Sequence, residues 1–179
     1  MITTNNTFSL SEDERKYYFD SFEKDTLFAK EVLVCQWYDP NDKELEIKMI
    51  FRLFNGTYSW CKIRKRRISD IHADKTIEYV EAQSLEDLLG MPFLCKRRSV
   101  LGNIYVDRFI VNDGICVNML ENEGDEEELK VFADRFKVQG LREVTSNCNY
   151  RSRDMAVPFK MMHLLELQLF LSFFSKQEK

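Results

Sequence analysis

The chain has 179 residues, of which 44% are hydrophobic and 31% are charged, and its formal net charge is −4. It is long enough and apolar enough to bury one core, which excludes wholesale disorder, collagen and a coiled coil. The acidic balance argues against a generic DNA-coating protein, which is usually basic overall, but it leaves room for a local basic patch.

The five cysteines and two histidines exclude several enzyme classes. No CxxC motif occurs, so a zinc ribbon or a thioredoxin-like site is not expected. His72 and His163 lack the partners for a histidine-based zinc site or a Ser-His-Asp triad, and neither GxxxxGK[ST] nor GxGxxG is present. The odd number of cysteines and the polar segment 1–12 predict reduced thiols in a cytoplasmic protein.

Turn signals divide most of the chain into short strands. The strands are expected at residues 12–19, 30–38, 44–54, 57–68, 75–82, 93–101, 104–111 and 115–123. Asp39 and Pro40 begin a strong turn, and Asn55-Gly56 is the best two-residue hairpin signal in the chain. Strands this close in sequence leave no room for parallel crossovers, so they are expected to be antiparallel.

Three helices are expected among these strands. Ser84 begins the first, at 84–89, with Asp87 placed as in a capping box. Apolar residues at helical spacing predict the second at 126–138, and the third follows Pro158 at 159–174. The third is apolar nearly all round but too short for a bilayer core of about 30 Å. We expect it to pack on the sheet, with a dimer contact or a partner groove as alternatives, in an antiparallel α+β fold.

Two pairs of glutamates are placed to share a strand face. Glu12 and Glu14 precede Lys16 at a spacing of two, and Glu121 and Glu123 end a later strand with the same spacing. At this spacing the side chains of a strand point to one side of the sheet. Such a pair either lies on a solvated edge or holds a divalent cation through its carboxylate oxygens.

Basic residues occupy other strands. They are Arg52, Lys62, Arg64, Lys96 and Arg98. Trp60 and Ile63 interleave with the basic run at 62–67, which fits a strand better than a disordered localisation signal or a nucleic-acid patch. If the sheet closes into a barrel, these cations and the glutamates line one lumen, which predicts a site for a metal-bound polyphosphate.

Short motifs in a fixed order resemble those of the CYTH family, the triphosphate tunnel metalloenzymes. The segment EDERKY at 12–17 is similar to the family's opening ExExK, and LENE at 120–123 resembles its ExE strand. Further matches are QWY at 36–38 for QGYL, Arg52 for the second arginine of RxR, KIR at 62–64 for TxK, KRR at 96–98 for KxR, VDRF at 106–109 for VDxF, and 143–156 for the ending EVT…RYxNxxLA.

The resemblance implies a fold and an activity. The fold would be an antiparallel barrel of about eight strands, open as a tunnel with helices outside. It would comprise residues 1–158, with residues 159–179 as a C-terminal helix packed on the barrel or extending from it. The activity would be hydrolysis of inorganic tripolyphosphate, a nucleoside triphosphate or an RNA 5′-triphosphate, with Mg²⁺ or Mn²⁺.

The resemblance also implies roles for single residues. The metal would be held by Glu12, Glu14, Glu121 and Glu123. The phosphate oxygens would be bound by Lys16, Arg52, Lys62, Arg64, Lys96 and Arg98. Of these, catalysis would use Lys16, Arg52 and Arg64, and Lys48 is the other candidate for the position of Arg52.

Departures from the family pattern leave other functions open. Ile50 stands where the first arginine of RxR is expected, and Lys62 and Arg64 replace the threonine and lysine of TxK. An arginine fork is not equivalent to the point charge of a lysine. The alternatives are a non-catalytic module that binds nucleotide or polyphosphate, and cyclisation of ATP as in class IV-type adenylate cyclases. We expect a small triphosphate or an RNA 5′ end as partner, no DNA and no membrane span, with a homodimer left open.

Overall fold

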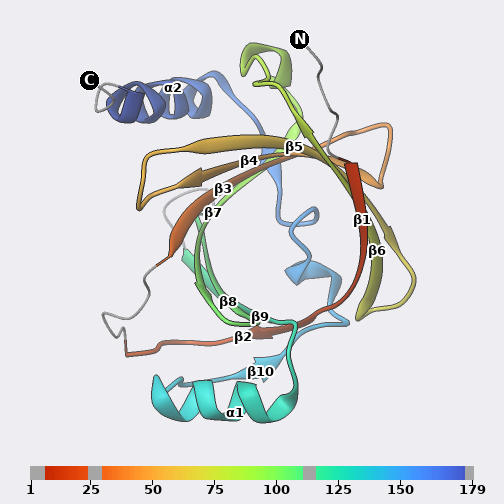
Figure 1. Cartoon of the computed structure of the whole chain (residues 1–179), viewed down its shortest axis with the longest axis vertical. Helices are drawn as coiled ribbons and strands as arrows, with labels where there is room; N and C mark the ends of the chain where they lie inside the picture. Colours follow the sequence, from red (N-terminus) through yellow and green to blue (C-terminus); the bar gives the residue numbers. More distant parts are fainter. Residues whose placement is uncertain (1–6, 24–29, 111–115, 176–179) are drawn as a thin grey trace.

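The computed structural model describes residues 7–23, 30–110 and 116–175. They form one mostly antiparallel sheet with two α-helices outside it (Figure 1). The strand order is β1-β6-β5-β4-β3-β7-β8-β9-β2-β10, and β11 pairs with β7. The sheet curls into a half-barrel whose ribbon surrounds a central space in Figure 1. The predicted strand-rich, antiparallel class is confirmed.

The strands match the predicted ones closely. Their bounds are β1 Thr7–Asp13, β2 Arg15–Tyr18, β3 Glu31–Tyr38, β4 Leu45–Arg52, β5 Tyr58–Arg67, β6 His72–Val80, β7 Pro92–Leu101, β8 Ile104–Ile110, β9 Cys116–Asn122, β10 Arg142–Glu143 and β11 Val157–Pro158. The ends of the predicted strands at Val111 and Ile115, and the turn predicted between them, lie outside the described residues.

One chain segment pairs with two strands that lie far apart in the strand order. The strand predicted at 12–19 begins earlier, at Thr7, and is divided at Glu14 into β1 and β2. On one side of Glu14, β1 pairs with β6, and on the other side β2 pairs with β9. The backbone N–H of Glu14 donates to the carbonyl of Ile71 at 2.8 Å. The chain therefore passes from the β6 side to the β9 side within a few residues.

The predicted turn between β3 and β4 is confirmed. The Asp39 side chain accepts hydrogen bonds from the backbone N–H groups of Asn41 and Asp42, at 2.7 and 3.1 Å. The predicted hairpin of β4 and β5 forms, but its loop comprises residues 53–56 and not the two residues expected, because Phe51 pairs with Tyr58 and the Arg52 backbone N–H donates to the Thr57 carbonyl at 2.8 Å. In this loop, Gly56 has a φ of 72°, a conformation that glycine adopts without steric cost. The antiparallel register of β4 and β5 follows from this turn.

Helix α1 (Glu126–Arg135) covers the outer face of β2, β8 and β9. Asp125 caps it by accepting a hydrogen bond from the Glu128 backbone N–H at 2.8 Å. Its buried residues Leu129 and Phe132 pack with apolar side chains of those strands. The helix ends before the predicted residue 138, because Lys137 has a φ of 48° and breaks the helical path.

The first predicted helix is reduced to a short 3₁₀ turn, Glu86–Leu88. The expected capping box is wrong, because Leu85 occupies the N-cap position and no side chain caps the turn. The Ser84 hydroxyl donates instead to the Glu86 carboxylate at 2.8 Å. With only three residues, the segment is too short for a cap to stabilise an α-helix.

Helix α2 (Met161–Ser175) packs on the outer face of β3, β4 and β5. Leu164 and Leu167 contact a buried aromatic cluster there. Within the cluster, Trp37 stacks on Trp60 with ring centroids 5.5 Å apart and meets Phe159 edge-on at 5.4 Å. Among the described helices, none is long and apolar enough to cross a membrane.

Truncation of this cluster is expected to destabilise the fold strongly. Trp37 is fully buried, so Trp37→Ala is expected to lower the free energy of unfolding by about 3–5 kcal/mol. Phe54→Ala is the control, because Phe54 is 55% exposed in a turn, and it should change stability by less than about 0.5 kcal/mol. Urea denaturation followed by circular dichroism measures both. Equal losses would show that the cluster does not support the sheet.

Candidate functional site

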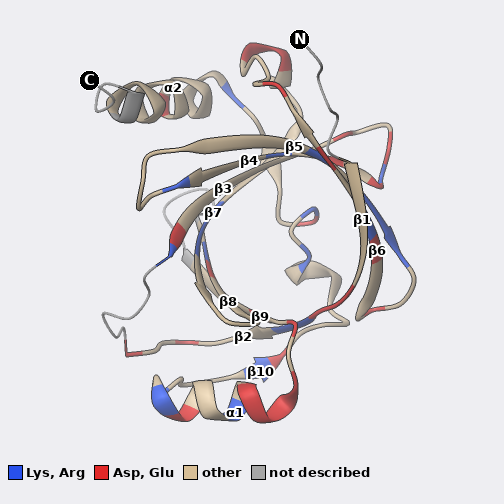
Figure 2. Cartoon of the chain, in the orientation of Figure 1, with Lys and Arg blue, Asp and Glu red and all other residues tan. Residues whose placement is uncertain are grey.

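Several charged side chains of the curled sheet are buried, and Figure 2 shows charged residues recurring along its strands. A pocket of about 480 Å³ opens on the inner face of the sheet, here called the charged pocket. Its inward-facing acidic residues are Glu14, Glu46, Glu121 and Glu123. Its inward-facing basic residues are Lys16, Lys48, Lys65, Lys75, Lys96 and Arg98, and Arg67 lies on the same inner face at the exposed rim. Alternate residues of each strand point inward, and the strands' curl brings these side chains together.

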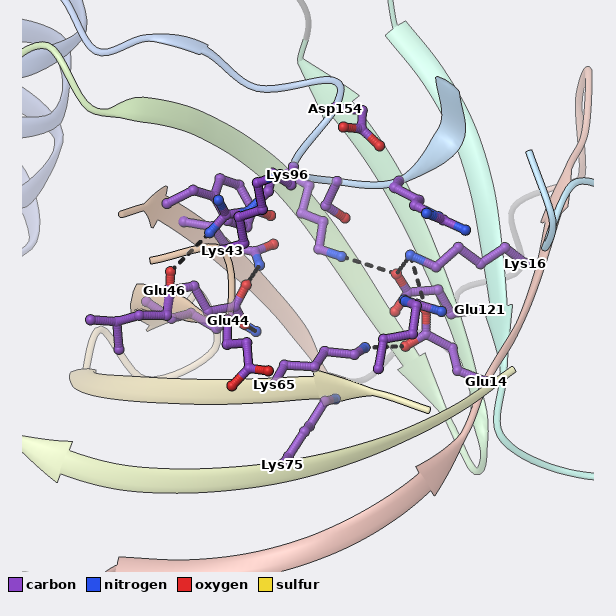
Figure 3. Close-up of a pocket in the computed structure, with 18 of the residues that line it drawn as sticks. Glu14, Lys16, Lys43, Glu44, Glu46, Lys65, Lys75, Lys96, Glu121 and Asp154 are labelled. Atoms are coloured by element: carbon purple, nitrogen blue, oxygen red, sulfur yellow. Dashed lines mark hydrogen bonds and ion pairs between the residues drawn. The ribbon is translucent and has the colours of Figure 1, made fainter. Parts of the chain in front are cut away.

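Glu121, on β9, is the centre of one ion network in this pocket (Figure 3). Its carboxylate lies 3.3 Å from the Lys96 ammonium and 3.5 Å from that of Lys16, and it contacts the Arg98 guanidinium. Arg98 also holds the fully buried Asp107 through two hydrogen bonds of 2.7 Å. The network joins β2, β7, β8 and β9.

A second network surrounds the point at which β1 becomes β2. The Lys65 ammonium lies 2.5 Å from Glu12 and 3.4 Å from Glu14, and Lys75 contacts the other oxygen of Glu12. Lys16 lies 2.9 Å from Glu14 and so joins this network to Glu121. Lysines from β5 and β6 therefore face glutamates from the segment at Glu14.

Gln36 and Glu46 form a third polar group, on β3 and β4. The Gln36 amide donates to Glu46 at 3.2 Å, and Lys48 lies 3.2 Å from the same carboxylate. Gln36 is 4% exposed, and its Oε1 atom accepts no hydrogen bond from the described residues. A buried carbonyl oxygen without a donor is costly, so this atom marks a position where a ligand or a water can donate.

The networks shift the pKa values of their members. Burial and repulsion from Glu121 act to raise the pKa of Glu14, but attraction from Lys16 and Lys65 outweighs them and lowers it to about 2. Burial also opposes ionisation of Glu121, yet attraction from Arg98 and Lys96 holds its pKa well below its usual value. Burial and repulsion from Arg98 lower the pKa of Lys96. The carboxylates thus stay ionised inside the sheet.

Three glutamates, here called the acidic trio, approach one another at one side of the pocket. They are Glu12, Glu14 and Glu123, and they offer carboxylate oxygens that lie within 4.8 Å of one another. Burial and repulsion from Glu12 raise the pKa of Glu123. One oxygen each of Glu12 and Glu14 is buried against a lysine ammonium group, 2.5 Å from Lys65 and 2.9 Å from Lys16 respectively. Oxygen ligands at these distances suit a hard divalent cation.

The segment that follows β10 crosses one end of the space inside the curled sheet. Lys16 and Thr145 anchor its start, since the Lys16 backbone N–H donates to the Thr145 hydroxyl at 3.0 Å. Arg153 anchors its middle through hydrogen bonds to three backbone carbonyls, among them that of Leu45 at 3.1 Å. Beneath it lies an apolar cluster of Tyr38, Leu94, Phe109, Met119 and Val144. The charged pocket is therefore bounded by apolar side chains at this end.

Most of the predicted site residues lie together. The structure brings the following predicted residues to the inner face: Glu12, Glu14, Lys16, Lys96, Arg98, Glu121 and Glu123. Glu123 is the exposed member, at the rim, where it accepts a hydrogen bond from the Tyr105 hydroxyl at 3.2 Å. These residues come from three parts of the chain that are distant in sequence, at 12–16, 96–98 and 121–123, which supports one site.

The placement of Lys62 and Arg64 in the lumen is wrong. Both lie on the outer face of β5, where Arg64 pairs with Asp42 at 2.7 Å on the exposed surface. The strand's other face, which includes the buried Ile63, points inward and carries Lys65. A shift of one residue exchanges the two faces of a strand completely.

Arg52 is also misplaced relative to the charged pocket. It is half-buried at the end of β4, its guanidinium donates to the Ser59 hydroxyl at 3.4 Å, and it does not line this pocket. Lys48, the other candidate from the sequence, does line it. Arg52 and Lys48 lie on the same face of β4, but the tilt of the strand places only Lys48 at the level of the carboxylates.

Sequence reasoning missed several residues of the site. They are Gln36, Glu46, Lys65, Arg67, Lys75 and Asp107. The available signal was the parity of β5: Trp60 belongs with the aromatic residues of the outer face, which puts Lys65 and Arg67 on the inner one. No signal of this kind marked Asp107, which is fully buried behind Lys96 and Arg98.

The lowered carboxylate pKa values predict loss of stability in acid. The pKa of Glu14 is lowered from 4.5 to about 2, and those of Glu46 and Glu121 are also lowered. Their contribution to the free energy of unfolding is therefore complete above about pH 4.5 and is lost as the pH falls toward 2. Urea midpoints measured without metal from pH 6 to pH 2.5 should fall steadily below pH 4.5. A midpoint that stays constant or rises over this range would contradict the paired state of these carboxylates.

Comparison with known proteins identifies no family. No family model matches the chain, and no curated protein matches it. Among solved structures, it is similar to the PH1819 protein from Pyrococcus horikoshii OT3, with 15% sequence identity and a TM-score of 0.40, over 73% of this chain and 93% of that chain.

Proposed function

We propose that the protein hydrolyses a triphosphate with the help of a divalent metal, inside the curled sheet. One observation carries the proposal: a single pocket holds six inward cations beside a trio of converging glutamates. A group of this many cationic side chains can bind the oxygens of several phosphates. The carboxylates can bind the metal that bridges to those phosphates. We further propose that the half-barrel works as a tunnel, because β1 and β2 continue each other through Glu14 and link its β6 and β9 sides.

The acidic trio fits Mg²⁺ or Mn²⁺ as the metal. Glu12, Glu14 and Glu123 provide only oxygen ligands, which both ions accept. Such an ion, when bound, polarises a phosphoryl oxygen and activates a water molecule. Glu121, which the resemblance assigned to the metal, is occupied by Lys96 and Arg98 in this structure. We therefore assign it the role of positioning those two cations.

Binding of metal and phosphate would support each other. Lys65 and Lys75 neutralise Glu12. If Glu12 and Glu14 held a divalent cation, these two ammonium groups would become available for phosphate oxygens. Lys16, Lys96 and Arg98 then contribute fixed positive charge where negative charge builds up during transfer.

A non-catalytic binding module is the second candidate. It is favoured by the ion pairing of Glu12, Glu14 and Glu121, each of which already has a basic partner. Such a pocket can exchange these internal partners for a bound anion without any chemical step. The two candidates share one site and differ only in turnover.

Phosphate release is the direct test of hydrolysis. Tripolyphosphate, ATP and a triphosphorylated RNA are incubated with Mg²⁺ or Mn²⁺. We expect metal-dependent release of phosphate from at least one of them, and a loss of about 100-fold or more in kcat/KM in Lys65→Met, which removes an inward charge. Lys62→Met is the matched control, since Lys62 lies on the outer face of the same strand, and it should leave the rate unchanged.

The outcomes separate the candidates. Equal losses in Lys62→Met and Lys65→Met would contradict a site on the inner face. Should Lys65→Met fail to fold, Arg67→Ala at the exposed rim of the pocket replaces it. No turnover by the wild type would exclude hydrolysis, and cyclic AMP with pyrophosphate as products would indicate cyclisation.

Thermal denaturation tests binding without turnover. A ligand that binds only the folded state raises the melting temperature, so millimolar tripolyphosphate with Mg²⁺ should raise it by several degrees. Glu14→Gln should reduce this shift, because it removes a metal ligand, whereas Glu166→Gln on the exposed face of α2 should not. The absence of any shift in the wild type would count against both candidates.

A further inference from the structure

A second pocket of about 360 Å³ adjoins the charged pocket. Lys75 and Glu123 line both pockets, so the two meet at the acidic trio. Its lining is mixed: Leu10, Ile77 and Tyr105 contribute apolar surface beside the polar or charged Ser11, Glu12, Asp13, Lys75 and Glu123. The part of the second pocket formed by Leu10, Ile77 and Tyr105 is here called the apolar chamber.

The inner face changes from charged to apolar at this point. On β1 the inward positions run from Glu12 to Leu10 and Phe8, and on β6 they run from Lys75 to Ile77 and then Tyr79. Leu10 pairs in register with Lys75, and Phe8 pairs with Ile77. On each strand the inward positions are apolar from two residues beyond its own charged residue, and β1 makes this change one inward pair earlier than β6.

The apolar residues are left open. Leu10 is 38% exposed, Phe8 is 42% exposed and Tyr79 is 44% exposed. The rings of Phe8 and Tyr79 lie 6.0 Å apart at 37° and form a tilted pair next to the chamber. The described residues leave much of their surface accessible, although they continue the face that lines the chamber.

Tyr105 connects the chamber to the charged residues. Its ring lies under the Arg98 guanidinium, 4.7 Å from the ring centroid, and its hydroxyl donates to Glu123 at 3.2 Å. One side chain thus contacts a proposed phosphate ligand, a proposed metal ligand and the apolar chamber. A molecule that extends from the acidic trio into the chamber would meet Tyr105 first.

We propose that the apolar chamber and the Phe8–Tyr79 pair bind the nucleoside of a ligand whose triphosphate lies in the charged pocket. The inference rests on the proposed function and narrows its substrate to a nucleoside 5′-triphosphate group, either free or at the end of an RNA. A base has a flat apolar face that stacks on aromatic side chains, whichever base it is. Inorganic tripolyphosphate has no such part and would leave this surface unused.

Calorimetric titration with Mg²⁺ tests the inference. The ligands are tripolyphosphate, the β,γ-imido analogue of ATP and a short triphosphorylated RNA. In the double variant Phe8→Ala/Tyr79→Ala, binding of the analogue or of the RNA is expected to weaken about tenfold or more through lost stacking, while tripolyphosphate binds as before. Phe54→Ala removes an exposed ring elsewhere and should change nothing, and Tyr79→Phe keeps the ring and should retain affinity.

Each result has a distinct meaning. If the variant binds the nucleoside ligands as tightly as the wild type, or if the wild type binds tripolyphosphate as tightly as either of them, the nucleoside site is excluded and the triphosphate site remains. If the wild type binds none of the three, the proposed function fails and the nucleoside site fails with it. Weakening for the ATP analogue assigns a free nucleotide, and weakening for the RNA alone assigns an RNA end.

Discussion

The interior of this sheet depends on the pairing of buried charges. An isolated ionised carboxylate is very costly to bury, and removing one partner of a buried pair typically costs about 3–5 kcal/mol. Asp107 and Glu121 are buried inside a sheet that elsewhere packs apolar residues on its outer face. Both are neutralised by Lys96 and Arg98 of β7, which is next to the strand of Asp107 and one strand removed from that of Glu121. Arg98 and Asp107 are direct cross-strand partners, so this charge pairing stabilises the pairing of β7 with β8.

The break at Glu14 gives the interior its functional geometry. Because β1 and β2 pair with different neighbours on either side of Glu14, glutamates from one segment face lysines of β5 and β6 as well as Glu121 of β9. The inner face of the half-barrel consequently has three zones. Apolar side chains under the segment after β10 bound one end, charged side chains fill the middle, and the apolar chamber lies at the other side of the acidic trio. A ligand that carries a polyanion next to an apolar group matches this sequence of zones.

The sequence predicted the strands and turns well, because those signals are local. The hairpin at Asn55-Gly56 and the turn at Asp39 depend on backbone conformations that single residues impose. The acidic positions Glu12, Glu14 and Glu121 could also be predicted from the sequence, since their alternation is visible within one strand. The inward face of β5 could not be predicted in this way. Alternation alone does not say which of the two faces of a strand points inward, and an interior filled with charge reverses the usual pattern of polar residues outside. The sequence pattern therefore predicted Lys62 and Arg64 on the inner face, where the structure has Lys65 and Arg67. The partners Lys75 and Asp107 meet their ions only when β6 pairs with β1 and β8 pairs with β7, and no signal within one strand reports this pairing.

A crystal structure grown with Mn²⁺ and the β,γ-imido analogue of ATP tests the central claim most directly. The anomalous signal of manganese locates the metal independently of the protein electron density. If the inner face is a metal and triphosphate site, the manganese peak lies among Glu12, Glu14 and Glu123, with phosphate oxygens on Lys65, Lys96 or Arg98. Manganese or phosphate bound only on the outer face, for example at Lys62 and Arg64, with the ion pairs of Glu12 and Glu121 undisturbed, would contradict it.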